Sequence, residues 1–519
     1  MSTRKHPSRF RAIRPSAEGL EERQLLSGVI SGVDGDGDTW TLKLIGPGAL
    51  GVVRQNGPDG NPVPLASPGQ IGAITVAGTD PLVSRLVGTV KRSATGDGRV
   101  FFQSLTELTN RSQQLGSGDG LLSIDMPHFW LGLTNSTGVT STTEPTILIP
   151  DGVNSLRFGG VDVTAFFGQD PTKALNKNGQ NNTVTVNLGL PQSGGTRVVV
   201  DRVVSDAQSS TSTAGVPTTN QDGVTFTVLG RLSLFQANEI AGNTKLPSAN
   251  LGTSGGTTVQ SLADTGTGVT GQIGNLRIGG NATNLSTITN DRISNYSVGG
   301  ETNNISILAP NGSRNLYFGK GLDTATILTH SIENLQANRG ALNSKVVSDR
   351  QIGEVVLGGD VVNTTIQSGY VQRLNQVLSN PANPPTDTAQ AGGSIRIRIA
   401  GGVTNSVIAA STQPFNGTFG SSQDLRLPLG QIHAKIEGAI DNSTATPDSP
   451  NTAFYAQSVS LNRGPVIPPN VPEAPYPKSA TPVKLPGITV PGPVSHTKFI
   501  PRPNTAGFVS HPTGTTKKK

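Results

Sequence analysis

The feature that most constrains this chain is a repeat of about 20 residues that runs from Leu276 to Ser443. Each copy starts with an apolar residue. A second, mostly apolar residue follows two positions later, and the residue between them is usually polar. This alternation is typical of a β-strand with one buried face. The copies start at Leu276, Tyr296, Leu316, Leu335, Val355 and Ile397, and more weakly at Ala434.

Two further features recur at constant places in the copies. Glycine-rich corners follow the first strand, as at Gly279-Gly280 and Gly299-Gly300. We expect these glycines to make a tight bend, because glycine tolerates positive φ angles. Eight residues after each start lies a position that is asparagine in six of seven copies. These positions, called the asparagine column below, are Asn284, Asn304, Thr324, Asn343, Asn363, Asn405 and Asn442.

A single copy of this repeat cannot bury its apolar face, whereas stacked copies can. Stacked strands pair in parallel about 4.8 Å apart, and the amides of the asparagine column can then hydrogen-bond along the stack. The alternative is that asparagine recurs only because it favours turns. A leucine-rich horseshoe has a similar period but needs a regular leucine scaffold, which this chain lacks. The repeat therefore predicts an all-β fold, a parallel β-solenoid, and the sequence resembles parallel β-helix proteins in general.

Composition divides the 519 residues into five segments. Residues 1–28 are a basic arm, residues 29–115 a β-rich region that would hold the first coils, and residues 256–450 the regular solenoid with loop insertions. Residues 116–255 break the period, so either the solenoid continues there with long insertions or a separate β module is inserted. Residues 451–519 are basic and rich in proline, which predicts a disordered, extended tail.

Charge and cysteine content exclude several classes of site. The net charge of +6 comes from the two ends, since residues 1–23 carry +3, residues 464–519 carry +6, and the rest carries −3. The body lacks a basic face with interleaved aromatic residues, so we expect no nucleic-acid partner. No apolar run is long enough to span a membrane. The chain has no cysteine, which excludes disulfides and thiolate metal sites.

A short motif at the end of the basic arm bears on localisation. The stretch from Gly19 to Ser27 reads Gly-Leu-Glu-Glu-Arg-Gln-Leu-Leu-Ser. It resembles an N-terminal signature of planctomycete exported and cell-surface proteins, Leu-Glu-Pro-Arg-x-Leu-Leu, with Glu22 in place of the proline. The resemblance covers under a tenth of the chain and implies an extracellular or cell-surface location. The matching residues are Leu20, Glu21, Arg23, Leu25 and Leu26.

One acidic turn is a candidate metal site. Asp34, Asp36 and Asp38 alternate with glycine before the first strand-like run. Carboxylates at alternate positions of a turn can converge on a hard cation, which makes calcium the candidate cofactor. The spacing is not that of an EF-hand, because Thr39 and Ile45 stand where that motif needs glycine and glutamate. The alternative is a solvated acidic turn without a metal.

The sequence favours a protein without catalytic activity. Sugar hydrolysis needs paired carboxylates at a set separation, and the acids of the regular coils do not recur at one position of neighbouring copies. We therefore expect a non-enzymatic, exported β-solenoid with a structural or adhesive role, and an envelope or extracellular polysaccharide as its partner. The alternatives are a carbohydrate-binding or carbohydrate-cleaving β-helix, and a scaffold that polymerises through its open ends. The oligomeric state stays open.

Overall fold

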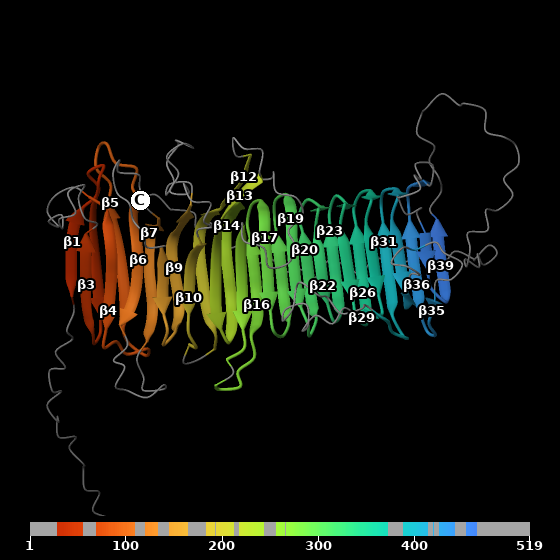
Figure 1. Ribbon diagram of the computed structural model, residues 1–519, viewed down its shortest axis with the longest axis horizontal. Coiled ribbons are helices and arrows are strands. Elements are labelled where there is room, and N and C mark those ends of the chain that lie inside the picture. Colours follow the sequence, from red (N-terminus) through yellow and green to blue (C-terminus); the bar gives the residue numbers. More distant parts are fainter. Residues whose placement is uncertain are drawn as a thin grey trace, which may run out of the picture.

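The computed structural model describes residues 28–54, 69–108, 120–132, 145–163, 183–191, 194–211, 217–242, 256–264, 266–371, 388–413, 419, 425–441 and 453–463. All regular secondary structure in these residues is β-strand. The strands wind into one rod, along which the colours run from red at the N-terminal strands to blue at the last described strands (Figure 1). The predicted all-β, parallel β-solenoid is thereby confirmed.

One sheet of the rod, called wall 1, contains the strands that the repeat predicts. Leu276 pairs with Tyr296, and the register continues through Leu316 to Leu335. It extends to Leu461, one rung beyond the last predicted copy. In chain order wall 1 comprises β5 (Arg85–Lys91), β7 (Leu121–Leu131), β9 (Val153–Asp162), β11 (Thr196–Val204), β14 (Arg231–Ala241), β16 (Gln272–Ile278), β18 (Ile293–Val298), β20 (Ser313–Phe318), β23 (Ile332–Ala337), β26 (Gln351–Leu357), β31 (Ser394–Ile399), β36 (Gln431–Ile436) and β39 (Ser458–Arg463).

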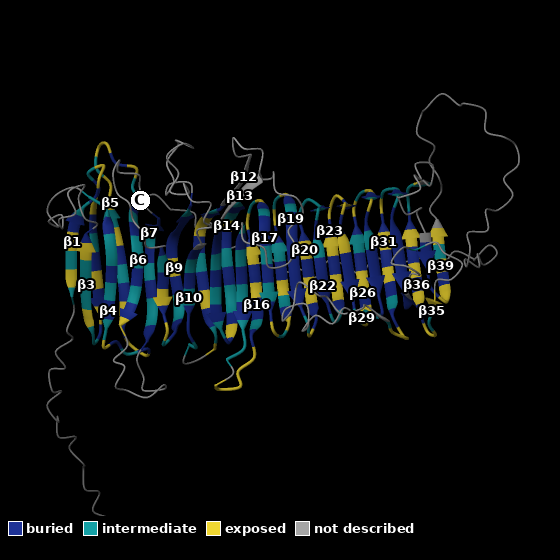
Figure 2. Ribbon diagram, in the orientation of Figure 1, coloured by how far each residue is buried: buried dark blue, intermediate teal, exposed yellow. Residues whose placement is uncertain are grey.

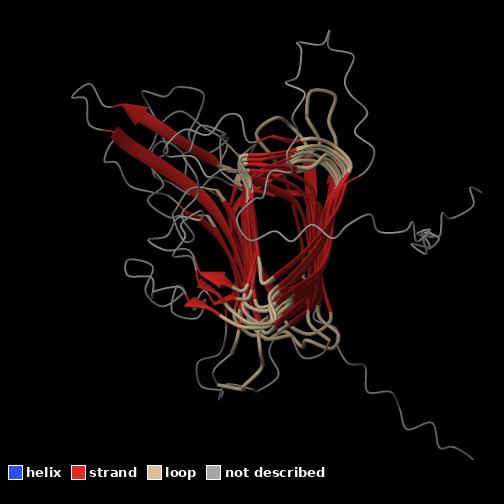
Figure 3. Cartoon of the chain, turned by 90° about the vertical axis from the view of Figure 1, so that its right-hand side faces the viewer, coloured by secondary structure: helices blue, strands red, loops and turns tan. Residues whose placement is uncertain are grey.

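The second sheet, wall 2, faces wall 1 across the interior, as the view along the rod shows (Figure 3). The chain alternates between the two walls, so each coil contributes one strand to each, paired in parallel with the coils before and after. Wall 2 comprises β4 (Ile71–Ala77), β6 (Val100–Leu108), β8 (Thr146–Ile149), β10 (Thr183–Leu188), β13 (Pro217–Leu229), β15 (Thr257–Leu262), β17 (Ala282–Thr289), β19 (Thr302–Ala309), β22 (Thr326–Thr329), β25 (Lys345–Ser348), β28 (Thr365–Ser368), β33 (Val407–Ala410) and β38 (Ala453–Tyr455).

A narrow third side joins the end of each wall 1 strand to the next wall 2 strand. In the regular coils it carries a small parallel sheet of two-residue strands. These are β21 (Leu322–Asp323), β24 (Ala341–Leu342), β27 (Val361–Val362), β32 (Val403–Thr404) and β37 (Ile440–Asp441).

A single apolar core fills the space between the walls and runs without a break from Trp40 to Val459. Alternate residues of each strand point into it, which gives the dark bands that cross neighbouring strands in Figure 2. Aromatic rings of successive rungs pack against one another within it, as where the ring centroids of Tyr296 and Phe318 lie 5.7 Å apart at an interplanar angle of 45°. Because each coil covers the apolar face of the next, the core forms only when coils are stacked.

The N-terminal end of the rod is closed by antiparallel strands. β1 (Val29–Val33) pairs with β2 (Thr39–Ile45), β2 pairs with β5 of wall 1, and β3 (Ala49–Arg54) pairs with β4 of wall 2. Trp40 is fully buried there, and the guanidinium of Arg54 lies 5.7 Å from its ring and donates to the carbonyl of Val33. These strands form a cap over the first coil.

The corners of the coils differ from the sequence prediction. The six described members of the asparagine column have positive φ angles, from 47° at Asn405 to 55° at Asn304. The glycines of the corners, such as Gly299 and Gly359, do not. They are required by close approach instead, since a Cβ on Gly359 would overlap the backbone oxygen of Arg339 in the coil before. The expectation of positive φ at these glycines was therefore wrong.

The structure also decides two questions about segment boundaries. The described strands of residues 116–255 pair in both walls, so the solenoid continues through them, with a projecting hairpin of β12 (Asp206–Thr211) and the first part of β13. The sequence analysis placed the start of the disordered tail at residue 451. This boundary is wrong, because β38 and β39 form a further rung of the solenoid. Val459 and Leu461 keep the apolar alternation there. Two small hairpins mark the bases of the loop insertions: β29 (Tyr370–Val371) with β30 (Thr388–Ala389), and β34 (Thr412–Gln413) with β35 (Leu425–Arg426).

Candidate functional site

The three candidate calcium ligands come together in the turn between β1 and β2, at the capped end of the rod. Each of Asp34, Asp36 and Asp38 offers a carboxylate oxygen, and these oxygens lie within 4.8 Å of one another. Asp34 and Asp38 are buried, whereas Asp36 is exposed. The alternation seen in the sequence therefore does produce a cluster of converging carboxylates.

These carboxylates also organise the neighbouring loop. Asp38 accepts hydrogen bonds from the backbone N–H groups of Ser93 and Gly98, each at 2.6 Å. Asp36 accepts one from the N–H of Asp97 at 3.0 Å. The loop between β5 and β6 is thereby tied to the cap. Much of the hydrogen-bonding capacity of Asp38 is used inside the protein, so this side chain has a structural role with or without a cation.

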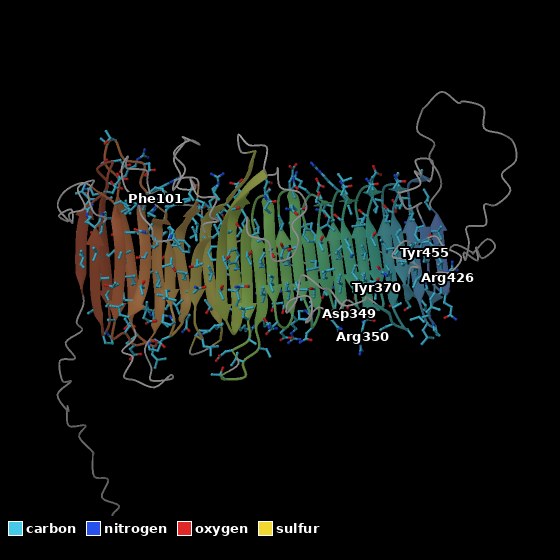
Figure 4. The ribbon with its side chains drawn as sticks, in the orientation of Figure 1. Phe101, Asp349, Arg350, Tyr370, Arg426 and Tyr455 are labelled. Atoms are coloured by element: carbon cyan, nitrogen blue, oxygen red, sulfur yellow. The ribbon has the colours of Figure 1, made fainter. Side chains whose placement is uncertain are left out.

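Three ionised carboxylates this close together would repel one another. Burial, and then the neighbouring Asp36 and Asp38, raise the pKa of Asp34 to about 7. A hydrogen bond from the Asp34 carboxyl lowers the pKa of Asp36. Beside the cluster is a hollow of about 250 Å³, lined also by Phe101, which Figure 4 labels near this end of the rod. A proton on Asp34 or a hard cation would each relieve the repulsion.

The asparagine column is built from two kinds of contact. Asn304 donates from Nδ2 to Oδ1 of Asn284 at 2.7 Å, and both side chains are buried. Asn363 donates in the same way to Asn343 at 3.1 Å, on the surface. Thr324 departs from this pattern and donates to the carboxylate of Asp323. Asparagine serves twice here, because its amides pair along the stack and it is a residue that tolerates the left-handed conformation.

A second column of amides, which the sequence analysis missed, lies on the outer face of wall 1. Asn295 donates to Asn275, Asn315 to Asn295, and Asn334 to Asn315, at 2.8, 2.8 and 2.9 Å. All four residues precede the apolar start of a copy, and this recurrence was the available signal. We call them the outer amide column. They link four successive rungs on the solvent side.

Among the described residues of the regular coils, Glu301, Glu333 and Glu437 are engaged in surface ion pairs with arginine or lysine. Arg314 bonds Glu333 at 3.1 Å, and Lys435 bonds Glu437 at 2.9 Å and, with Arg398, lowers the pKa of Glu437. His330 Nδ1 lies 3.5 Å from Asp349 Oδ2, which is the outer limit of a hydrogen bond. Asp349 is labelled in Figure 4. Exposed ion pairs of this kind stabilise weakly. The pairs Arg314–Glu333 and Arg398–Glu437 join neighbouring rungs.

Two larger hollows lie on the sides of the rod. One, of about 550 Å³, is on the third side, and its charged lining has both signs: Glu301, Lys320, Asp323, Arg339 and Asp360. The other, of about 440 Å³, is on the outer face of wall 1 between β7 and β14. Its charged lining is Asp125, Arg157 and Arg197. We call the second one the wall 1 hollow.

Several predicted residues lie outside the described part of the chain. These are the signature residues Leu20, Glu21, Arg23, Leu25 and Leu26, and the last member of the asparagine column, Asn442. Within the described residues, no helix exists that could cross a bilayer. No protein-family model, curated protein or solved structure matches this chain.

Proposed function

We propose that this chain is a non-enzymatic, exported β-solenoid that has a structural or adhesive role at the cell surface. The observation that carries the proposal is the unbroken rod itself. Thirteen strands of wall 1 stack in parallel from β5 to β39, and at about 4.8 Å per rung they form a body about 60 Å long. A stiff rod of this kind suits a spacer or scaffold that holds surfaces apart.

The outward side chains support the same proposal. On the regular coils they form the outer amide column and exposed ion pairs such as Arg339 with Glu301 at 3.7 Å. The amide column connects successive rungs, and the Arg339–Glu301 pair connects coils that lie two rungs apart. The cap at the N-terminal end also argues against a filament of head-to-tail stacked rods, because β1 to β3 cover the edge that a second rod would need.

The surface location rests on the signature resemblance at Leu20–Leu26 and is tested by cell fractionation. Deleting residues 1–27 should leave the truncated protein inside the cell, while its thermal unfolding stays like that of the full chain. Leu25→Asp is a milder variant with the same expected result, and Ser8→Ala in the same arm is the matched control. A truncated protein that still reaches the surface would refute the sorting role.

The absence of catalysis is tested on the purified full chain. We expect no reducing ends and no unsaturated products from pectin or alginate, with or without calcium. The physical reason is that hydrolysis and elimination on sugars need positioned acids and bases, whereas acids of the regular coils such as Glu333 and Glu437 are used in ion pairs. Cleavage that a single Asp or Glu substitution abolishes would establish the carbohydrate-cleaving alternative.

A further inference from the structure

The outer face of wall 1 is basic over the rungs from β5 to β16. Two columns of outward residues run along these rungs, and they contain four exposed arginines, at positions 85, 157, 197 and 277, against one acid, Asp125. The body of the chain outside the two ends carries a net charge of −3. These two columns therefore carry a net charge of +3, opposite in sign to the charge of the body as a whole.

The wall 1 hollow lies within this basic stretch. Arg157 pairs with Asp125 at 3.6 Å, and both side chains are about half exposed. No ion pair or hydrogen bond from the Arg197 side chain to a described residue is present, and this arginine is exposed. Since Asp125 balances one of the two guanidinium groups, the hollow keeps a net positive charge. It differs in this from the hollow on the third side, where acids outnumber bases.

The positions of the two arginines suit one shared anion. Arg197 lies opposite Ser155 on the next strand, and Arg157 is two residues further along from Ser155. One strand spacing and two residues separate their Cα atoms by about 8 Å. Arginine side chains are long enough to converge over that distance, and a guanidinium binds a carboxylate or sulfate through two parallel hydrogen bonds.

The rest of the lining selects among anionic ligands. Ser123, Ser155 and Gln236 offer hydroxyl and amide groups that can bond to alcohols. None of the described lining residues is aromatic, so neither a neutral sugar ring nor a nucleobase finds a ring to stack on. The volume of about 440 Å³ is in the range of small-ligand sites. An acidic sugar unit combines the anion and the hydroxyl groups that this lining can bind.

We propose that the wall 1 hollow binds an acidic saccharide through Arg157 and Arg197, with the anion as either a carboxylate or a sulfate. This inference rests on the proposed surface role and names its partner. The basic stretch continues along the rod in both directions, from Arg85 to Arg277, so a chain of acidic sugars can lie along the same face beyond the hollow.

Binding is measured by calorimetry on the full-length protein with three probes: a hexagalacturonate, a carrageenan-derived sulfated hexasaccharide, and neutral cellohexaose. Arg197→Gln should weaken binding of the acidic probes about tenfold or more, since a charge-assisted pair is lost. Ser155→Leu leaves the charge of the hollow unchanged but fills it with a larger side chain. This variant should also weaken binding of the acidic probes. Arg396→Gln, an exposed arginine of the same wall outside the hollow, should change affinity by less than about twofold.

Each possible result either supports the proposed saccharide site or overturns it. Preference for the carboxylate or the sulfated probe identifies the anion. Equal losses for Arg197→Gln and Arg396→Gln would mean diffuse charge attraction and would overturn the site. So would cellohexaose binding as tightly as the acidic probes, or no acidic binding at about 1 mM. These results leave the fractionation experiment unaffected, so failure of the site and failure of the surface role are told apart.

Discussion

Asparagine in the asparagine column pairs its amide along the stack and also tolerates a left-handed backbone. Substitutions at two positions of the column should separate these two contributions to stability. Asn304 and Asn363 occupy equivalent corners with φ angles of 55° and 49°, and each donates to the asparagine of the coil before. The pair of Asn304 is buried, whereas that of Asn363 is exposed. Replacing each by leucine removes the amide and forces a side chain into the left-handed region. Replacing each by glycine removes the amide without placing another side chain in that region.

The expected losses in the free energy of unfolding follow from the structure. Leucine in the left-handed conformation costs about 1–2 kcal/mol. Loss of the buried donor to Asn284 Oδ1 costs about 1–3 kcal/mol, whereas an exposed hydrogen bond is worth less than about 0.5 kcal/mol. Asn304→Leu should therefore cost about 2–5 kcal/mol and Asn304→Gly about 1–3 kcal/mol. Asn363→Leu should cost about 1–2 kcal/mol, and Asn363→Gly close to nothing.

Denaturant unfolding measures these differences, and hydrogen exchange at the affected corners shows whether the loss stays local, since solenoid coils depend mainly on their neighbours. Asn315→Leu is the control, because Asn315 belongs to the outer amide column and lies on an exposed strand position. If Asn304→Gly proves as harmless as Asn363→Gly, the buried amide pair does not stabilise the stack. If Asn363→Leu and Asn363→Gly lower the free energy of unfolding equally, the left-handed backbone at position 363 does not explain the cost of leucine.

Three further predictions concern the cap and the corners. If calcium occupies the Asp34 cluster, a chelator should lower the melting temperature of the full chain and have no effect on Asp36→Ala; an unchanged wild-type melting temperature would exclude the metal. Because the folded-state pKa of Asp34 is raised from 3.8 to about 7, stability without a divalent cation should fall by a few kcal/mol as pH rises from about 4 to about 7 and then level off. Asp34→Asn should remove that fall, and a flat wild-type profile would contradict the raised pKa. Gly359→Ala should lower the free energy of unfolding by about 1–3 kcal/mol, because its Cβ would overlap the oxygen of Arg339. Gly279→Ala, where the nearest atom is 3.6 Å away, should cost less, and equal losses would refute the close-approach explanation.

The regular half of the rod could be predicted from the sequence because two periods coincide there. The alternation within each copy indicates a strand with one buried face, and the spacing of about 20 residues places Leu276, Tyr296 and Leu316 in one column. Both patterns are local, so they appear in the chain without knowledge of distant contacts. The convergence of Asp34, Asp36 and Asp38 was predictable for the same reason, since one turn contains all three.

The physical requirement at each corner position became clear only from the tertiary structure. Asparagine and glycine are both turn residues, and a sequence does not distinguish a position that needs a positive φ from one that needs an absent side chain. The neighbouring coil makes that distinction, because the backbone of Arg339 occupies the space where Gly359 would carry a Cβ.

The wall 1 hollow was equally hidden in the sequence. Its arginines, hydroxyl groups and amide come from β7, β9, β11 and β14, which are separated by chain segments of unequal length and do not follow the 20-residue period. Stacking of successive coils brings residues as distant as Ser123 and Gln236 onto one face, and the strand pairing that does so is a property of the assembled walls.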